Sequence, residues 1–139
     1  PGKTALNPFE ILLEINLQPL PLGTGGTYYK LSTRKAMDIA IVGVASVITL
    51  EEGVCRSCRI ALGAVAPTPI RAIRAEKMLE GQKLELELLD RAAEAAMEEA
   101  RPISDHRSSA EYRREMVRAL TIKTVQQAAL LASGNRGIK

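Results

Sequence analysis

The residues of this sequence whose types and spacing could carry chemistry are few. Cys55 and Cys58 form a C-x-x-C pair, and the only histidine, His106, lies far along the chain. Two thiols cannot complete a tetrahedral zinc site or hold an iron–sulfur cluster. We therefore expect free thiols in a reducing compartment, with a redox-active pair or a metal site shared with another molecule as the alternatives.

Nothing in the sequence has the pattern of a catalytic nucleophile with its base. His106 lies in a polar run, and no serine or cysteine motif places a partner beside it. Glu98 and Glu99 are explained as part of the solvated face of a helix. We expect no catalytic residue and no metal site in this chain, and no enzymatic activity from the chain by itself.

The composition argues against several classes of partner. The net charge is only +3 and aromatic residues make up 3% of the chain, which is unlike a nucleic-acid-binding protein. The apolar run at residues 39–50 has the length of a strand and is too short to span a membrane, and the start does not resemble a signal peptide. We expect one cytoplasmic domain over residues 1–139, with a disordered tail at 133–139.

The centre of the chain has the pattern of a β-hairpin. More than half of residues 39–50 are β-branched, which favours a strand. Glu51, Glu52 and Gly53 supply a turn, and residues 59–66 form the returning strand. The returning strand is rich in alanine and glycine, so either a helix or a ligand could lie close to its backbone.

The remaining elements place strands before helices. Strands are expected at 11–17 and 28–32, separated by a flexible turn at 23–26, and helices at 75–80, at 85–100 and from Ser108 or Ser109 onward. The buried faces predicted for the second and third helices are Leu86, Leu89, Ala93, Ala96 and Ala100, and Met116, Val117, Leu120, Thr124, Ala128 and Leu131. This order predicts an α+β fold, a small antiparallel sheet of three to four strands followed by three helices packed on one face.

Three motifs in a fixed order link the sequence to a known family. They are RKAMDIA at residues 34–40, IALGAVAPTPIRA at 60–72, and ARPISD at 100–105 followed by SAEYRR at 109–114. Together they resemble the C-terminal domain of the flavoprotein subunit of molybdenum hydroxylases, the family of xanthine dehydrogenase and aerobic CO dehydrogenase. The resemblance covers roughly residues 1–127, and it implies that the chain is the C-terminal portion of a longer subunit with the fold predicted above.

The resemblance also implies a cofactor and partners. The chain would cover one side of FAD, whose pyrophosphate is held by glycine-rich segments of the FAD-binding N-terminal domains, which this sequence lacks. Electrons would pass from the molybdenum cofactor on a molybdenum subunit, through the iron–sulfur clusters on an iron–sulfur subunit, to FAD. They would then leave to an acceptor such as NAD. Cofactors carry such redox chemistry, and the protein sets their position and access.

Four residues match positions that touch FAD in that family. Lys30 matches a lysine contact, Leu12 matches an apolar contact, and Asp38 and Ile39 match a loop that borders the flavin ring. The alternatives are that Leu12 and Ile39 are ordinary core residues and that Lys30 is an exposed strand charge.

The alternative function is a non-catalytic module that assembles subunits and never contacts flavin. Residues 101–114 are rich in arginine and include a tyrosine, which are residue types favoured at interfaces. The same residues also fit a structural role, and we expect Arg113 or Arg114 to pair with Asp105 while a serine caps the last helix.

Overall fold

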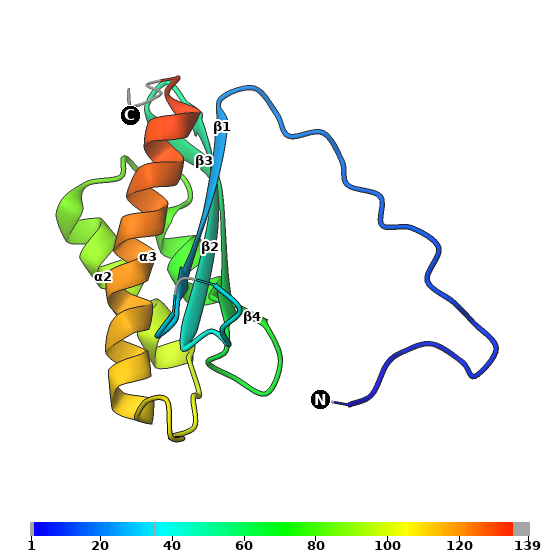
Figure 1. Cartoon of the computed structure of the whole chain (residues 1–139). Helices are drawn as coiled ribbons and strands as arrows, with labels where there is room; N and C mark the ends of the chain where they lie inside the picture. Colours follow the sequence, from blue (N-terminus) through cyan, green and yellow to red (C-terminus); the bar gives the residue numbers. More distant parts are fainter. Residues whose placement is uncertain (1, 35, 135–139) are drawn as a thin grey trace.

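The chain forms two layers, a four-stranded antiparallel sheet and three helices that cover one face of it (Figure 1). The elements are β1 (Thr24–Leu31), β2 (Val42–Glu51), β3 (Val54–Gly63), β4 (Ile70–Arg71), α1 (Ile73–Leu79), α2 (Leu86–Glu99) and α3 (Ala110–Ala132). The strands lie side by side in chain order, which confirms the predicted α+β fold. This computed structural model describes residues 2–34 and 36–134, so Lys35 of the RKAMDIA motif and most of the expected tail lie outside the described residues.

The predicted hairpin is the centre of the sheet. β2 and β3 pair antiparallel, and the turn between them uses positive φ at Glu52 (50°) and Gly53 (80°). Val42, Val44 and Ile48 of β2 are fully buried under the helices, as expected of alternate residues in a strand with one covered face. The β-branched pattern therefore predicted this element correctly.

A β-bulge in the hairpin determines where the two cysteines point. Thr49 pairs with Ser57 and Leu50 pairs with Cys55, so Arg56 is an extra residue without a partner on β2. Residues three apart on a regular strand face opposite sides, but the extra residue brings Cys55 and Cys58 to the same, helix-covered side. Both are free thiols and both are buried.

The strand expected at residues 11–17 is wrong. This stretch is extended, but it belongs to no strand, and Figure 1 shows it running clear of the body of the domain. Its large apolar side chains are exposed; Ile11 and Leu17, for example, are 78% and 86% exposed. The sequence has the pattern of a strand, but the described part of the chain offers it no pairing partner.

The turn expected at residues 23–26 is only partly confirmed: a turn is present at residues 22–23, with φ of 70° at Gly23, but β1 already begins at Thr24. Gly25 serves packing instead. A Cβ atom on Gly25 would lie 2.1 Å from the Ala128 carbonyl oxygen and 2.5 Å from the Ala132 amide nitrogen of α3. A helix therefore approaches the backbone of β1 closely, and α1 packs against the returning strand β3 as well.

The buried faces of the second and third helices are largely those predicted. Leu89, Ala93, Ala96 and Ala100 are buried, but Leu86, the first residue of α2, is exposed. The predicted stripe of α3 is buried along its centre, while Met116 is half-buried and Leu131 remains 40% exposed near the end of the helix. No helix among the described residues is both long and apolar enough to cross a membrane.

A serine caps the start of α3, as expected. Ser109 is the N-cap, and its hydroxyl accepts a hydrogen bond from the Tyr112 amide at 3.1 Å. Deeper in the domain, the Thr124 hydroxyl of α3 donates to the Leu120 carbonyl and lies 2.8 Å from the hydroxyl of Ser46 on β2. This buried pair joins the helix to the middle of the sheet.

Candidate functional site

The loop between β1 and β2 is built around the carboxylate of Asp38. It accepts hydrogen bonds from the Thr33 hydroxyl at 2.6 Å, from the Arg34 amide at 2.7 Å and from the Ile39 amide at 2.8 Å. These bonds favour the charged form and lower the pKa of Asp38 to about 2, with the Thr33 contact the largest cause. Asp38 therefore shapes the loop with the loop's own donors.

Lys30 ties the end of β1 to the same loop. Its ammonium donates a hydrogen bond to the main-chain oxygen of Asp38 at 2.5 Å. An ammonium has three donors, so this contact leaves others that can bind a ligand. The next residue of the loop, Ile39, is 61% exposed, and its side chain is therefore available at the surface rather than buried in the core.

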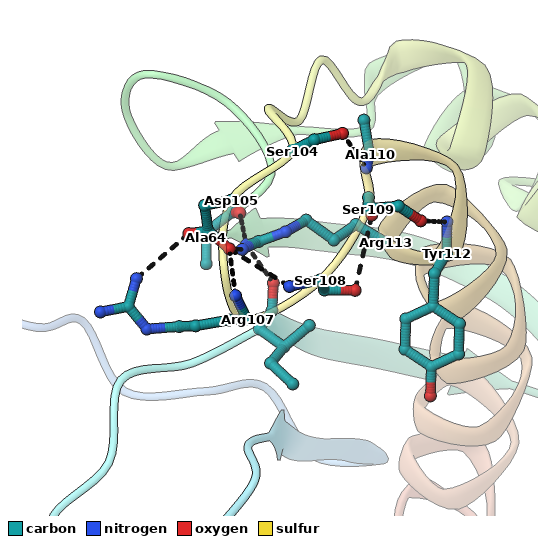
Figure 2. A network of polar contacts seen from close by, with 10 residues as sticks. Ala64, Ser104, Asp105, Arg107, Ser108, Ser109, Ala110, Tyr112 and Arg113 are labelled. Atoms are coloured by element: carbon teal, nitrogen blue, oxygen red, sulfur yellow. Dashed lines mark hydrogen bonds and ion pairs between the residues drawn. The ribbon is translucent and has the colours of Figure 1, made fainter.

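A buried arginine of α3 holds three segments together at this end of the domain. Figure 2 shows Arg113 reaching Asp105 and the chain at Ala64 from the first turns of the helix. One guanidinium nitrogen, Nη1, donates to the carbonyl oxygens of Ile41 at 2.9 Å and Ala64 at 3.2 Å, and Nη2 lies 2.7 Å from Asp105 Oδ1. Arg113 is only 4% exposed, and the expected pairing with Asp105 is confirmed.

Asp105 organises the loop before α3. It accepts hydrogen bonds from the Arg107 amide at 2.9 Å and from the Arg107 side chain at 3.1 Å, in addition to its bond with Arg113 (Figure 2). The Arg107 amide and the Arg113 guanidinium hold the pKa of Asp105 well below its usual range. In the same loop the Ser104 hydroxyl accepts a bond from the Ala110 amide at 2.8 Å, so the start of α3 is fixed relative to the loop.

Two adjoining clefts open beside these loops. The first, which we call the Ala64 cleft, has a volume of about 380 Å³ and is lined by Ile39, Ala40, Ala64, Ala66, Pro67, Arg101, Ile103, Asp105, Arg107 and Arg113. The second, the Asp38 cleft, has a volume of about 500 Å³ and is lined by Thr33, Arg34, Met37, Asp38, Ile39, His106 and Arg107. Because Ile39 and Arg107 line both clefts, the two adjoin, and we call the pair the hollow.

This hollow combines apolar surface with positive charge. Ile39, Met37 and Ile103 expose apolar side chains, while Arg107 and Arg34 contribute guanidinium groups. Such a lining suits a flat, partly apolar ligand that carries anionic or hydrogen-bond-accepting groups. The described residues contain no cluster of three or more side chains that could hold a metal ion.

The two cysteines take no part in this hollow. They lie inside the sheet–helix core, where a hydrogen bond between the two side chains raises the pKa of the Cys58 thiol well above its usual range and lowers that of Cys55. Burial raises the pKa of Cys58 further.

The structure brings three of the four predicted site residues together. Lys30, Asp38 and Ile39 lie on one loop and the strand end that supports it, whereas Leu12 lies on the extended N-terminal segment and is 67% exposed. The alternative that Leu12 and Ile39 are core residues is therefore wrong. Sequence reasoning did not place Arg107 beside this loop, although its position between the two parts of the motif, 100–105 and 109–114, was an available signal.

A model of one protein family matches residues 27–128 of this chain. Its description is the CO dehydrogenase flavoprotein C-terminal domain, and the match contains all three sequence motifs and both loops of the hollow. The chain belongs to this family. In this flavoprotein domain the hollow is bounded by the most distinctive segments of the sequence.

Known relatives agree with this assignment. The chain is 34% identical over 135 residues to a putative xanthine dehydrogenase FAD-binding subunit of Escherichia coli (strain K12), a match that covers 96% of this chain and 46% of the relative. It is 38% identical over 125 residues to the carbon monoxide dehydrogenase medium chain of Afipia carboxidovorans, covering 90% of this chain and 43% of the relative. The flavoprotein domain therefore spans less than half the length of the relatives it matches.

Solved structures have the same fold. A crystal structure of Cu,Mo-CO dehydrogenase in its cyanide-inactivated form superposes with a TM-score of 0.75 at 38% identity, covering 79% of this chain and 38% of the other. Quinoline 2-oxidoreductase from Pseudomonas putida 86 superposes with a TM-score of 0.73 at 32% identity, covering 84% and 39%. The sheet, the helices and their order are thus common to a group of oxidoreductases.

Proposed function

We propose that this chain forms one wall of a composite FAD site in an oxidoreductase complex of the molybdenum hydroxylase type. In this proposal the FAD-binding portion of the same subunit holds most of the cofactor, and an iron–sulfur subunit and a molybdenum subunit complete the complex. Membership of the flavoprotein family supports the proposal, as do the names of the relatives, which include FAD-binding and medium subunits. The free thiols Cys55 and Cys58 fit the reducing cytoplasm as its location.

The observation that carries the proposal is the meeting of Lys30, Asp38 and Ile39 beside the hollow. The family resemblance points to these three residues, and the contact from the Lys30 ammonium to the Asp38 main chain holds them at one end of the domain. The hollow beside them offers apolar surface and cationic donors. That combination fits a flavin, which has an apolar ring system with polar edges and a negatively charged diphosphate.

The residues would have distinct tasks at such a site. Bound FAD supplies the capacity to accept and release electrons. Ile39 and Met37 would exclude water from the ring system, and Lys30 and Arg107 would supply positive charge to its polar groups. Asp38 would act indirectly, because its carboxylate is already bonded within the loop and sets the position of Ile39.

A binding experiment on the assembled protein tests this proposal. FAD affinity is measured by flavin fluorescence and absorption for the FAD-binding portion alone, for this chain alone, and for the two together. We expect tight binding only when both are present. Replacing Lys30 by Ala in the assembled protein removes a charge-assisted contact and should weaken binding about tenfold.

A matched control separates this effect from a general loss of positive charge. Lys123 of α3 lies over the ring of Tyr29 at 3.9 Å, whereas Lys30 is bonded to the loop that carries Asp38 and Ile39, so Lys123→Ala should leave FAD affinity unchanged. Equal FAD affinity with and without this chain would refute the proposal, and would favour the alternative that the chain is an assembly module without flavin contact.

A further inference from the structure

The N-terminal segment carries a row of apolar side chains that nothing in the described structure covers. Ile11, Leu13, Ile15 and Leu17 are between 74% and 86% exposed. The segment leaves the start of β1 and extends away from the sheet and helices, as Figure 1 shows. Exposed apolar side chains over this length indicate a surface that is buried against another protein or another part of the same protein.

The order of residues in this segment is that of a strand with two different faces. Side chains at odd positions from 11 to 17 are all apolar, whereas Glu14, Asn16 and Gln18 at even positions are polar. Alternation with a period of two places these sets on opposite faces of an extended chain. Leu12 is the one apolar residue on the polar face.

The backbone of the segment also lacks partners. Within the described residues, no main-chain hydrogen bond is formed by residues 11–22. If the apolar face were buried against another protein surface, these amide and carbonyl groups would lose water and would need new partners. The edge of a β-sheet supplies such partners in register.

The described domain does not supply that edge. Pro19 and Pro21 separate the segment from β1, and their fixed φ angles favour an extended connection over a tight return onto β1. The relatives, in contrast, are more than twice as long as the stretch this chain matches, so in them further protein adjoins this domain.

We propose that residues 9–18 add as a strand to the edge of a β-sheet in the FAD-binding portion of the subunit. The identity of that partner rests on the proposed function. Ile11, Leu13, Ile15 and Leu17 pack into the partner's core, and Leu12 faces the opposite side of that sheet. The two portions of the subunit are then joined by main-chain hydrogen bonds as well as by the connecting chain.

Hydrogen–deuterium exchange on the assembled subunit, with this chain alone as the reference, tests the strand directly. We expect the amides of residues 11–17 to exchange freely in the chain alone and at least about a hundredfold more slowly in the assembled subunit. Free exchange in both would overturn the proposal. So would protection that appears in the chain alone together with dimer formation, because the strand would then pair with a second copy.

Two neighbouring substitutions test which face is buried. Ile15→Asp and Asn16→Asp add the same charge one residue apart, on opposite faces of the proposed strand. Ile15→Asp should reduce association with the FAD-binding portion at least about a hundredfold, because it would bury a carboxylate in an apolar core. Asn16→Asp should leave association within a few fold, and equal effects of the two would overturn the assigned faces.

Two readouts keep this inference separate from the proposed function. The fold of each variant chain is checked by urea unfolding, which should be unchanged because neither side chain packs on the domain. Flavin absorption is recorded on the same samples. If the strand is protected but FAD binding does not depend on this chain, the strand proposal is supported and the proposed FAD wall is refuted. If the strand is unprotected but FAD retention depends on this chain, the FAD wall is supported and the strand proposal is refuted.

Discussion

The contact between α3 and β1 leads to a sharp prediction about two adjacent glycines. Replacing Gly25 by Ala would place a methyl group 2.1 Å from the Ala128 carbonyl oxygen and 2.7 Å from the Leu131 Cβ atom. These distances are far inside van der Waals contact, and the nearest atom belongs to a helix backbone that cannot rotate away. The end of α3 must therefore move outward.

The neighbouring position provides the control. A Cβ atom on Gly26 would lie 3.5 Å from Val47 Cγ2 and 3.9 Å from the Ser46 carbonyl oxygen, which are ordinary contacts. Overpacking a well-packed site typically costs about 1–3 kcal/mol, and we expect Gly25→Ala to lie near the upper end of that range. Gly26→Ala should be neutral or stabilising by about 0.5 kcal/mol, because alanine is less flexible than glycine in the unfolded chain.

Urea unfolding followed by circular dichroism measures both variants against the unmodified chain. The result that would refute this reasoning is a Gly25→Ala variant within about 0.5 kcal/mol of the unmodified chain, or a Gly26→Ala variant equally destabilised. The first would mean that α3 does not lie against β1 as described, and the second would mean that the substitution acts through strand propensity rather than through the helix.

Two further predictions concern the loops beside the hollow. Arg113→Met keeps much of the side-chain volume but leaves two carbonyl groups without their donor. The free energy of unfolding, measured by urea titration, should therefore fall by about 2–4 kcal/mol. The control is Arg114→Met at the exposed neighbouring position, which should change it by less than about 0.5 kcal/mol. Asp38 has a pKa lowered from 3.8 to about 2, so its bonds stabilise the folded loop at neutral pH and are lost as the pH falls from about 4 towards 2. The stability difference between the unmodified chain and Asp38→Asn should therefore be present at pH 7 and shrink over that acid range; a difference independent of pH would contradict the assigned role of the carboxylate.

Local pattern was sufficient to predict the elements that the chain pairs with itself. The β-branched residues of β2 and the turn at Gly53 are neighbours in sequence, and the hairpin needs nothing else to define it. The stretch at residues 11–17 has an equally good strand pattern, yet it forms no strand in the described structure. A strand requires a partner, and the pattern of one segment carries no information on where its partner lies.

The candidate site shows the same limit: local sequence grouped some of its residues and could not place the others. Lys30, Asp38 and Ile39 are close in sequence, and a resemblance to one motif was enough to group them. Arg107 reaches the same hollow from a loop before α3, and its position depends on the bonds among Asp105, Arg113 and the end of β3. Such long-range packing is set by the whole fold, so the sequence identified these residues as interface or capping groups without placing them beside the loop.

The bonds of Arg113 also have a consequence for the order in which the protein is made. Its guanidinium reaches the carbonyl of Ile41, a residue that leaves the ribosome 72 positions earlier. The sheet can pair as soon as β3 has emerged, but the loop that carries Asp38 and Ile39 does not gain this support until α3 has been synthesised and has docked. The hollow is therefore completed late in biosynthesis, and a chain that ended before α3 would form a sheet in which the loop carrying Asp38 and Ile39 lacks its anchor.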